Sequence, residues 1–191
     1  MSKNRLEAFS DGVIAILITI MVLELKAPPG SGWPALHAAV PSLLTYVLSF
    51  VFLGIYWNNH HHLLHATDRV NGKILWANLH LLFWLSLIPF VTSWMGEHYL
   101  ETVPTAVYGI VMLAAAIAYK ILQNSIVTLQ GRHSALAAAF GSDFKGKISP
   151  VLYVAAIVLA FLLPTIAQGI FVFVAMMWLV PDRRIESGLK H

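Results

Sequence analysis

The stretch RLEAFSDGVIAILITIMVLEL, Arg5 to Leu25, decides how this chain folds. From Gly12 to Leu23 it consists almost wholly of Val, Ile, Leu, Ala and Met, the composition of a segment that lies in lipid. Four charged or hydroxyl-bearing residues nevertheless occupy its first turns: Arg5, Glu7, Ser10 and Asp11. Polar groups at the start of a membrane helix need partners, so this segment predicts a helix with a polar anchor at one end.

The composition of the whole chain predicts a membrane protein. Of its 191 residues, 58% are hydrophobic and only 11% are charged, whereas soluble domains contain about 25% charged residues. The chain has no cysteine, which excludes disulfides and Cys-based metal sites. The pI near 9.3 does not indicate a nucleic-acid partner, because the basic residues lie in short loops between apolar runs. The first apolar run is too long for a signal-peptide core and lacks an A-x-A-like cleavage site, so we expect a retained helix.

Hydropathy and chain breakers predict an all-α, polytopic fold: one six-helix transmembrane domain over residues 1–191. A spanning helix needs about 20 mostly apolar residues, and breakers such as KAPPGSGW and PDRR separate the apolar runs. The expected helices cover about 6–25, 34–65, 73–96, 104–128, 147–163 and 165–181. Pro164 predicts a tight hairpin between the last two.

The distribution of Lys and Arg predicts the orientation. With the N-terminus inside, Lys26 alone falls on the outer side, which obeys the positive-inside rule. We therefore expect both termini in the cytoplasm and the protein in the bacterial plasma membrane. The residues on the expected inner side are Lys3, Arg5, Arg69, Lys73, Arg132, Lys145, Lys147, Arg183, Arg184 and Lys190.

Unusual polar residues from three expected helices fall in one layer on the inner side. Asp11 lies six residues beyond Arg5, about 9 Å along the axis. The second helix returns to this depth at WNNHH, Trp57 to His61, and the third has Asn78 and His80. Because a carboxylate in lipid is costly, mutual hydrogen bonding is the natural account. Asn78 and His80 are about 200° apart, so both cannot face Asp11.

Catalytic and metal chemistry are not expected. His61 and His65 have the i, i+4 spacing that can hold zinc, but no third ligand of suitable type is evident. A membrane-embedded metal enzyme built on these histidines stays a rival hypothesis. No Ser/His/Asp or paired-carboxylate arrangement indicates hydrolysis, and no glycine-rich loop indicates a nucleotide. We therefore expect no enzyme activity, no metal and no cofactor.

Projected at 100° per residue, the first helix has two distinct faces. Phe9, Ile20 and Leu23 fall within about 40° of Ile16, whereas Asp11 lies near 220°. A narrow stripe of small residues runs beside the Ile16 face, and such residues let helices approach closely in lipid. This stripe, Ala8, Gly12, Ala15 and Thr19, fits a contact within the subunit and a contact between subunits equally well.

The stretch Arg5-x-x-x-Phe9-Ser10-Asp11 resembles the RxxxFSD signature of the prokaryotic relatives of the lysosomal potassium channel, a family without the TVGYG filter. Supporting matches are Trp57-x-x-His60-His61, Asn78 and the LIPF stretch at 87–90. The resemblance covers the whole chain and is strongest over residues 1–95. Together with the polar layer, it assigns these residues to a motif and helix-anchoring network: Arg5, Phe9, Ser10, Asp11, Trp57, His60, His61, Asn78 and His80.

The resemblance implies a homotetramer in which the first helix of each subunit lines a central potassium pore. Carried onto this sequence, the aliphatic bottleneck consists of Ile16, Ile20 and Leu23. Some prokaryotic members use a threonine layer for selectivity, and Thr19 occupies that place. We expect a gate that excludes water and a modest preference for potassium, which gives up its hydration water more readily than sodium.

Glu24 and the polar layer around Asp11 each allow two interpretations. Glu24 near the outer mouth either raises the local cation concentration or is an ordinary interfacial acid. Asp11 and the histidines could instead form a proton relay, which makes a proton channel or a proton-coupled transporter the main rival. No pair of broken helices indicates a midplane substrate site, which argues against a transporter.

Overall fold

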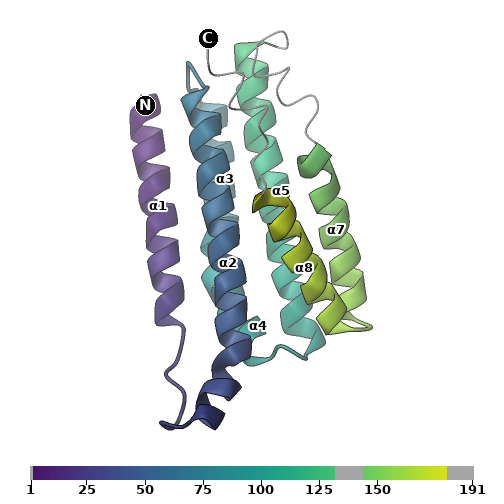
Figure 1. The fold of residues 1–191 in the computed structure, drawn as a ribbon. Helices are drawn as coiled ribbons and strands as arrows, with labels where there is room; N and C mark the ends of the chain where they lie inside the picture. Colours follow the sequence, from purple (N-terminus) through teal and green to yellow (C-terminus); the bar gives the residue numbers. More distant parts are fainter. Residues whose placement is uncertain (1, 132–143, 180–191) are drawn as a thin grey trace.

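The computed structural model describes residues 2–131 and 144–179, and every regular element in these two ranges is an α-helix. In chain order the helices are α1 (Lys3–Leu23), α2 (Trp33–His65), α3 (Gly72–Ser86), α4 (Ile88–Glu97), α5 (Thr102–Gln130), α7 (Phe144–Ala160) and α8 (Pro164–Leu179). The helices α3 and α4 follow one another along the chain and together form a single apolar span, Gly72–Glu97 (Figure 1). Residues 180 and 181 of the expected last helix lie outside the described residues, as do Arg132, Arg183, Arg184 and Lys190.

Four spans are long and apolar enough to cross a membrane: α1, α2, α3 with α4, and α5. At 21 residues, α1 is about 31 Å long, which matches the hydrocarbon core of a bilayer. The helices α7 and α8 have only 17 and 16 residues and meet in a short turn at Phe161 to Leu163.

The expected continuous third helix, 73–96, is interrupted at Leu87. Pro89 has no N–H to donate to the carbonyl of Leu85, so the regular hydrogen-bond ladder is lost there. The Leu87 N–H donates to the carbonyl of Trp84 at 3.3 Å, and the ladder resumes when the Val91 N–H bonds to the Leu87 carbonyl at 3.1 Å. The span therefore consists of two helices joined at Leu87.

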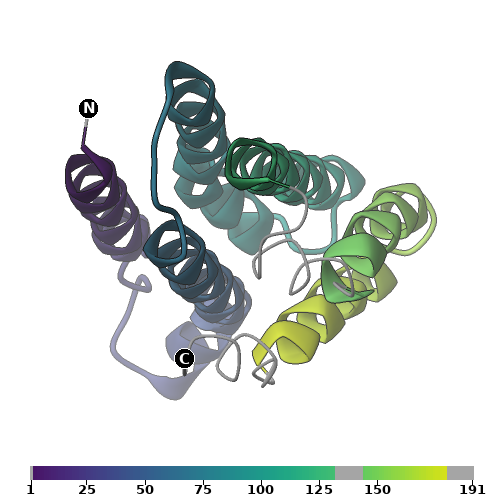
Figure 2. The same ribbon diagram turned by 90° about the horizontal axis from the view of Figure 1, so that it is seen from above.

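The helix α5 lies inside the bundle and packs against α3, α4, α7 and α8, whereas α1 packs against α2, α3 and α4. The view along the bundle shows α1 at its edge (Figure 2). One side of α1 faces its neighbours, and the buried residues recur every three or four positions: Leu6, Ser10, Ile14, Leu17 and Met21. The opposite side of α1 is left uncovered by the subunit.

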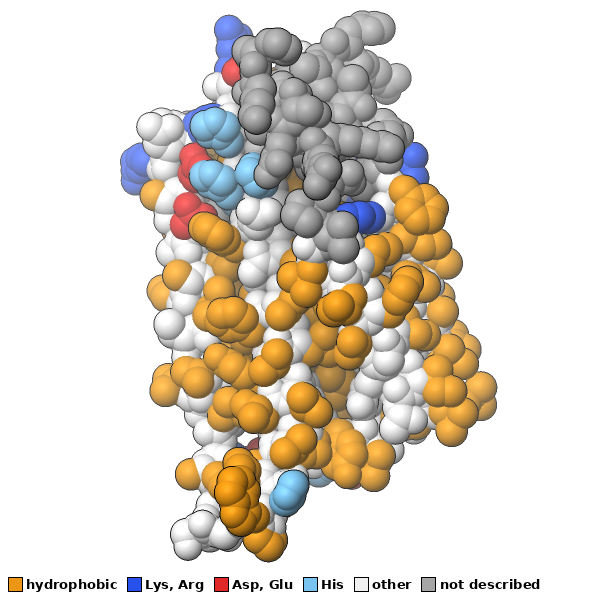
Figure 3. Space-filling model, viewed as in Figure 1, with side chains coloured by type: hydrophobic (Ala, Val, Ile, Leu, Met, Phe, Trp, Pro, Cys, Tyr) orange, Lys and Arg blue, Asp and Glu red, His pale blue; other side chains and the backbone are white. Residues whose placement is uncertain are grey.

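The two ends of the bundle differ in polarity. In Figure 3, charged and histidine side chains gather at the end where α1 begins, and apolar side chains cover most of the remaining length of that face. At the other end, the Lys26 ammonium contacts Glu97 Oε1 at 2.6 Å and so links the segment after α1 to the end of α4. This hydrogen bond and the carboxylate's charge raise the pKa of Lys26 above its ordinary value.

Candidate functional site

The helix α1 separates an attached face from an exposed apolar face. Ile16, Ile20 and Leu23 expose 57%, 40% and 78% of their surface in the subunit. Ile14 and Met21, on the attached face, are fully buried. A membrane protein can turn such a face to lipid, to another subunit or to a pore. The contacts of the opposite face show how α1 is held in the subunit.

A chain of three buried side chains holds α1 to α2 and α3. Asn78 Nδ2 on α3 donates to Ser10 Oγ at 2.9 Å, and Asn78 Oδ1 lies 2.7 Å from His60 Nε2 on α2. Ser10 Oγ in turn donates to the Leu6 carbonyl at 2.8 Å. Because the carboxamide oxygen only accepts, His60 must carry its proton on Nε2. One asparagine thus joins three helices.

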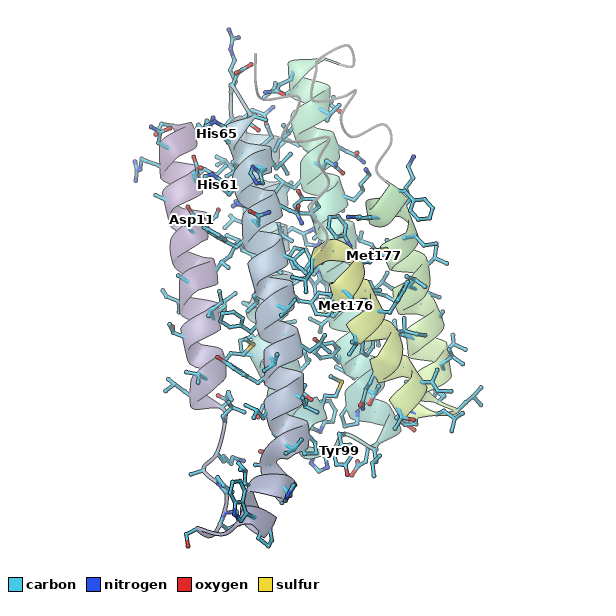
Figure 4. The ribbon with its side chains drawn as sticks, viewed as in Figure 1. Asp11, His61, His65, Tyr99, Met176 and Met177 are labelled. Carbon is cyan, nitrogen blue, oxygen red and sulfur yellow. The ribbon has the colours of Figure 1, made fainter. Side chains whose placement is uncertain are left out.

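Two further contacts lie nearer the surface between α1 and α2. Trp57 Nε1 donates to Asp11 Oδ1 at 3.1 Å, and His61 Nδ1 lies 3.2 Å from Glu7 Oε1. Figure 4 shows Asp11 on α1 facing the side of α2 that carries His61, with His65 further toward the end of the bundle. Lys3 Nζ adds a hydrogen bond to the His65 carbonyl at 2.7 Å. Asp11 itself is half-buried, so the interior position of the motif belongs to Ser10.

Three expected network residues do not join this network. His80 is exposed and accepts a hydrogen bond from Trp84 Nε1 of its own helix at 3.0 Å. The reason is the angle of about 200° between residues two positions apart, which turns His80 away when Asn78 faces inward. Phe9 is exposed on the uncovered side of α1. Arg5 is exposed too, and its side chain has no ion-pair partner among the residues that the structure describes.

Thr19 and Glu24 accompany the exposed apolar face. Thr19 is exposed, and its hydroxyl donates to the Ile16 carbonyl at 2.8 Å. Its oxygen therefore keeps acceptor capacity toward whatever lies on the exposed side. Glu24 is exposed and caps the end of α1 directly after Leu23.

A second buried polar cluster was not predicted from the sequence. Thr92 Oγ1 on α4 contacts Ser49 Oγ on α2 at 2.7 Å, and Ser49 Oγ lies 3.0 Å from the hydroxyl of Tyr108 on α5. Thr92 also bonds to the Ile88 carbonyl of its own helix at 2.7 Å. Such backbone bonds let hydroxyl residues lie anywhere in an apolar helix, so their positions alone give little signal. Glu7 was also missing from the expected network, although its charge in a membrane helix could have indicated it.

The histidines at the end of α2 form a stack of rings. The ring centroids of His61 and His65 lie 6.0 Å apart, and those of His61 and Trp57 lie 6.3 Å apart. Within the two described ranges, no group of three His, Cys, Asp or Glu side chains could hold a metal ion. The arrangement suits attachment of helices at a membrane boundary.

Comparisons with known proteins agree on one family. The model of the endosomal/lysosomal potassium channel TMEM175 matches residues 5–89. A protein of Chryseobacterium sp. (strain P1-3), named a potassium channel, is 55% identical over 191 residues and covers both chains completely. The crystal structure of a lysosomal potassium-selective channel TMEM175 homolog from Chamaesiphon minutus has a TM-score of 0.84 at 29% identity, covering 95% of this chain and 97% of that one.

A vertebrate relative is more distant. The human endosomal/lysosomal proton channel TMEM175 is 38% identical over 96 residues, which are 44% of this chain and 19% of the human protein. The bacterial relative, in contrast, matches along its whole length. The chain therefore belongs to the TMEM175 family of ion channels.

Proposed function

We propose that this chain is one subunit of a homotetrameric potassium channel whose central pore is lined by α1. The observation that carries the proposal is the contrast between the two faces of α1: Ile16, Ile20 and Leu23 are exposed, while the opposite face is held by hydrogen bonds to two other helices. The Chryseobacterium relative is named a potassium channel and the Chamaesiphon homolog is described as potassium-selective, and both support potassium as the permeant ion. The family is one of ion channels, so the chain is an integral membrane protein and not an enzyme.

The proposed bottleneck works by excluding water. Four copies of Ile16, Ile20 and Leu23 around one axis make apolar rings, and a narrow apolar constriction gates by dewetting. An ion that passes the widened constriction gives up part of its hydration shell. Since potassium gives up water more readily than sodium, the preference for potassium is real but modest.

Thr19 and Glu24 add polar groups beside the proposed apolar bottleneck. Thr19 donates its hydroxyl proton to the Ile16 carbonyl, so its oxygen can face a cation as an acceptor. A fourfold ring of such oxygens would partly replace lost water. Glu24 lies beyond Leu23, where four carboxylates raise the cation concentration at the outer mouth.

The anchoring network sets the position of the bottleneck. Ser10, Asn78 and His60 fix the back of α1 in the interior, while Asp11 with Trp57 and Glu7 with His61 fix it nearer the surface. A shift of this network turns or tilts α1 and so changes the width of the bottleneck. The inner charges therefore act on the ion through α1 and need not touch it.

The proposed orientation places the start of α1 in the cytoplasm of a bacterial cell, in its plasma membrane. Lys and Arg are concentrated toward this end, and the charged side chains gather there in Figure 3. An even number of passes returns the chain to the same side, which gives two cytoplasmic termini.

The rival function is proton conduction, which the name of the human relative favours. A relay needs groups that both take up and release protons. The carboxamide of Asn78 stands between His60 and Ser10, and Ser10 donates to a backbone carbonyl, so the chain of bonds ends there. These bonds are better suited to holding helices than to passing protons.

Ion flux from purified protein in liposomes tests the proposal. We expect a potassium gradient to drive flux, a smaller flux with sodium, and a reversal potential that follows potassium. A reversal potential that follows the pH gradient would support the proton channel, and electroneutral uptake coupled to protons would support a transporter. Bound metal in stoichiometric amount, without current, would support the metal-enzyme hypothesis.

A further inference from the structure

A pocket away from the exposed face of α1 lies between α2, α5, α7 and α8. Its empty space is about 530 Å³, part of it open to the surroundings. Phe52, Ile55 and Ala116 contribute apolar wall, while Lys120 and Gln123 on α5 contribute polar groups. None of these five residues takes part in the anchoring network or the proposed bottleneck, so the channel function leaves the pocket unexplained.

The polar side of the pocket holds an unused hydrogen-bond donor. Gln123 is 1% exposed, and Lys120 Nζ donates to its Oε1 at 2.7 Å. Lysine can only donate, which fixes the orientation of the amide and leaves Nε2 on the other side. Gln123 Nε2 is buried and has no partner among the residues that the structure describes. Buried donors are nearly always paired, so this amide indicates a missing acceptor.

The charge of the pocket specifies what kind of acceptor fits. Lys120 is the one charged side chain among the described residues that line it, and none of them is an acid. The Lys120 ammonium has three donors, of which Gln123 Oε1 takes one. An anionic oxygen next to Lys120 would receive a charge-assisted hydrogen bond from the ammonium, and a small turn of the Gln123 side chain that brings Nε2 to the pocket would add a second.

The position of the pocket along α5 indicates that its ligand is an amphiphile. Lys120 lies 18 residues after Thr102, the first residue of α5, or about 27 Å along the axis. With a hydrocarbon core of about 30 Å, this places Lys120 and Gln123 at the boundary between acyl chains and head groups. Trp178, a residue type typical of that boundary, also lines the pocket and donates to Ser149 Oγ at 2.9 Å.

From these contacts we infer that the pocket binds the phosphate of an anionic membrane phospholipid, with Lys120 and Gln123 as its ligands. The apolar wall at Phe52, Ile55 and Ala116 contacts the glycerol and the first methylenes, and the acyl chains continue into the bilayer. The site attaches a lipid from the proposed inner leaflet to α2, α5, α7 and α8. It does not depend on which ion the protein conducts.

Lipid titration of delipidated full-length protein in detergent tests this site. The probes are palmitoyl-oleoyl phosphatidylglycerol, phosphatidylcholine with the same chains, and inorganic phosphate, and the readout is the concentration that gives half of the maximal rise in Tm. Phosphatidylcholine has the same phosphate but also a fixed choline cation, which Lys120 repels. We therefore expect phosphatidylglycerol to act at about tenfold lower concentration than phosphatidylcholine. Equal action of the two lipids, or an equal rise with phosphate alone, would overturn the lipid site.

Four variants assign the effect to the pocket. Lys120→Met should abolish the preference for phosphatidylglycerol, and Lys120→Arg should keep it. Ala116→Leu fills the pocket without changing a charge and should weaken phosphatidylglycerol binding, whereas Ala114→Leu on the same helix, outside the lining, should not. An unchanged preference in Lys120→Met, or equal effects of the two alanine substitutions, contradicts the proposal. If Lys120→Met does not fold, the alanine pair decides alone.

Discussion

Asn78 uses both ends of its carboxamide. Its NH₂ group donates to Ser10 Oγ on α1, and its oxygen accepts from His60 Nε2 on α2. A single α3 side chain therefore satisfies polar groups on two other helices. No aliphatic residue and no ionised acid of this size can donate and accept in this way. The importance of Asn78 therefore lies in hydrogen bonding rather than in volume.

Replacing Asn78 by leucine should destabilise the protein. Asn78→Leu keeps the size but leaves His60 Nε2 buried without an acceptor, which costs about 1–3 kcal/mol. For a chain of this length that corresponds to a fall in Tm of about 3–10 °C in detergent. The matched control is Asn58→Leu, since Asn58 is exposed on α2 and should leave Tm unchanged. Equal Tm values for the two variants would mean that the carboxamide is not an anchor.

The inward position of Ser10 could not be predicted from the sequence. A shared polar layer containing Asp11, the α2 histidines and Asn78 could be predicted from depth along three helices. Which residue of the Phe-Ser-Asp motif turns inward could not, because neighbouring residues differ by about 100° and the rotation of α1 depends on packing. The structure buries Ser10 completely and leaves Asp11 beside Trp57.

Ile16 is the residue that tests the apolar bottleneck. Ile16→Asn puts a hydrated amide into the proposed ring, so water remains in the constriction and ions pass with more of their hydration shell. The ratio of potassium to sodium permeability, from reversal potentials in liposomes or planar bilayers, should fall toward unity. Val22→Asn is the control, because Val22 is exposed but about 240° from Ile16 around α1. Unchanged selectivity in Ile16→Asn would remove Ile16 from the filter.

At the scale of whole helices, close contacts at glycine set the spacing between α2 and α4. A Cβ added to Gly96 would lie 2.9 Å from the backbone Cα of Ser42, so the two helices approach too closely for any side chain there. Such close approach is how helices associate in lipid, where dispersion contacts replace the hydrophobic effect. The contact also holds α4 close to α2 near Glu97, the partner of Lys26.

Gly96→Ala should therefore separate α2 from α4 and destabilise the protein by about 1–3 kcal/mol. Gly54→Ala on α2 is the matched substitution, because an added Cβ there meets nothing within 4 Å. It should leave stability unchanged or raise it by up to about 1 kcal/mol through helix propensity. Thermal unfolding in detergent compares the two. A Gly96→Ala protein as stable as wild type would show that the helices can move apart without loss.

The break between α3 and α4 could not be predicted from proline alone. Pro41 lies inside α2 and Pro150 inside α7, and both helices continue through them. At Pro89 the helix ends and restarts instead, with Leu87 between the two parts. Whether a proline bends a helix or divides it depends on which neighbouring groups bond the carbonyls that it frees. Only tertiary packing decides this.

At the scale of the whole molecule, the four long apolar spans could be predicted from the sequence, whereas the pocket between α2, α5, α7 and α8 could not. Length and hydropathy identify α1, α2, the α3–α4 span and α5, because each exceeds the width of the hydrocarbon core. The turn at Pro164 separates the two short helices. The pocket requires side chains from four helices to stop short of contact, and no local pattern in the sequence records that.

Disulfide cross-linking on the exposed face of α1 tests the proposed tetramer. Since the chain has no cysteine of its own, a single introduced cysteine can link only to its copy in another subunit. If four α1 helices surround one axis, Leu23→Cys brings thiols close enough for a disulfide, which needs Cα atoms roughly 4.4–6.8 Å apart. Mild oxidation in membranes should then give covalent dimers on a denaturing gel. The undenatured particle, without its detergent, should have a mass about four times 21.1 kDa.

Two control variants separate a central axis from random collision. The controls are Phe161→Cys and Leu17→Cys. Phe161 is 66% exposed, against 78% for Leu23, but lies in the turn between α7 and α8, and Leu17 lies on the buried face of α1. Both should remain monomeric on the gel under the conditions that link Leu23→Cys. Faster linking through Phe161→Cys would place a different surface between subunits, and a particle of one subunit's mass would leave Ile16, Ile20 and Leu23 facing lipid. A particle of one subunit's mass would exclude a pore lined by α1, whereas selective linking through Leu23→Cys requires neighbouring α1 helices to meet at their exposed apolar faces.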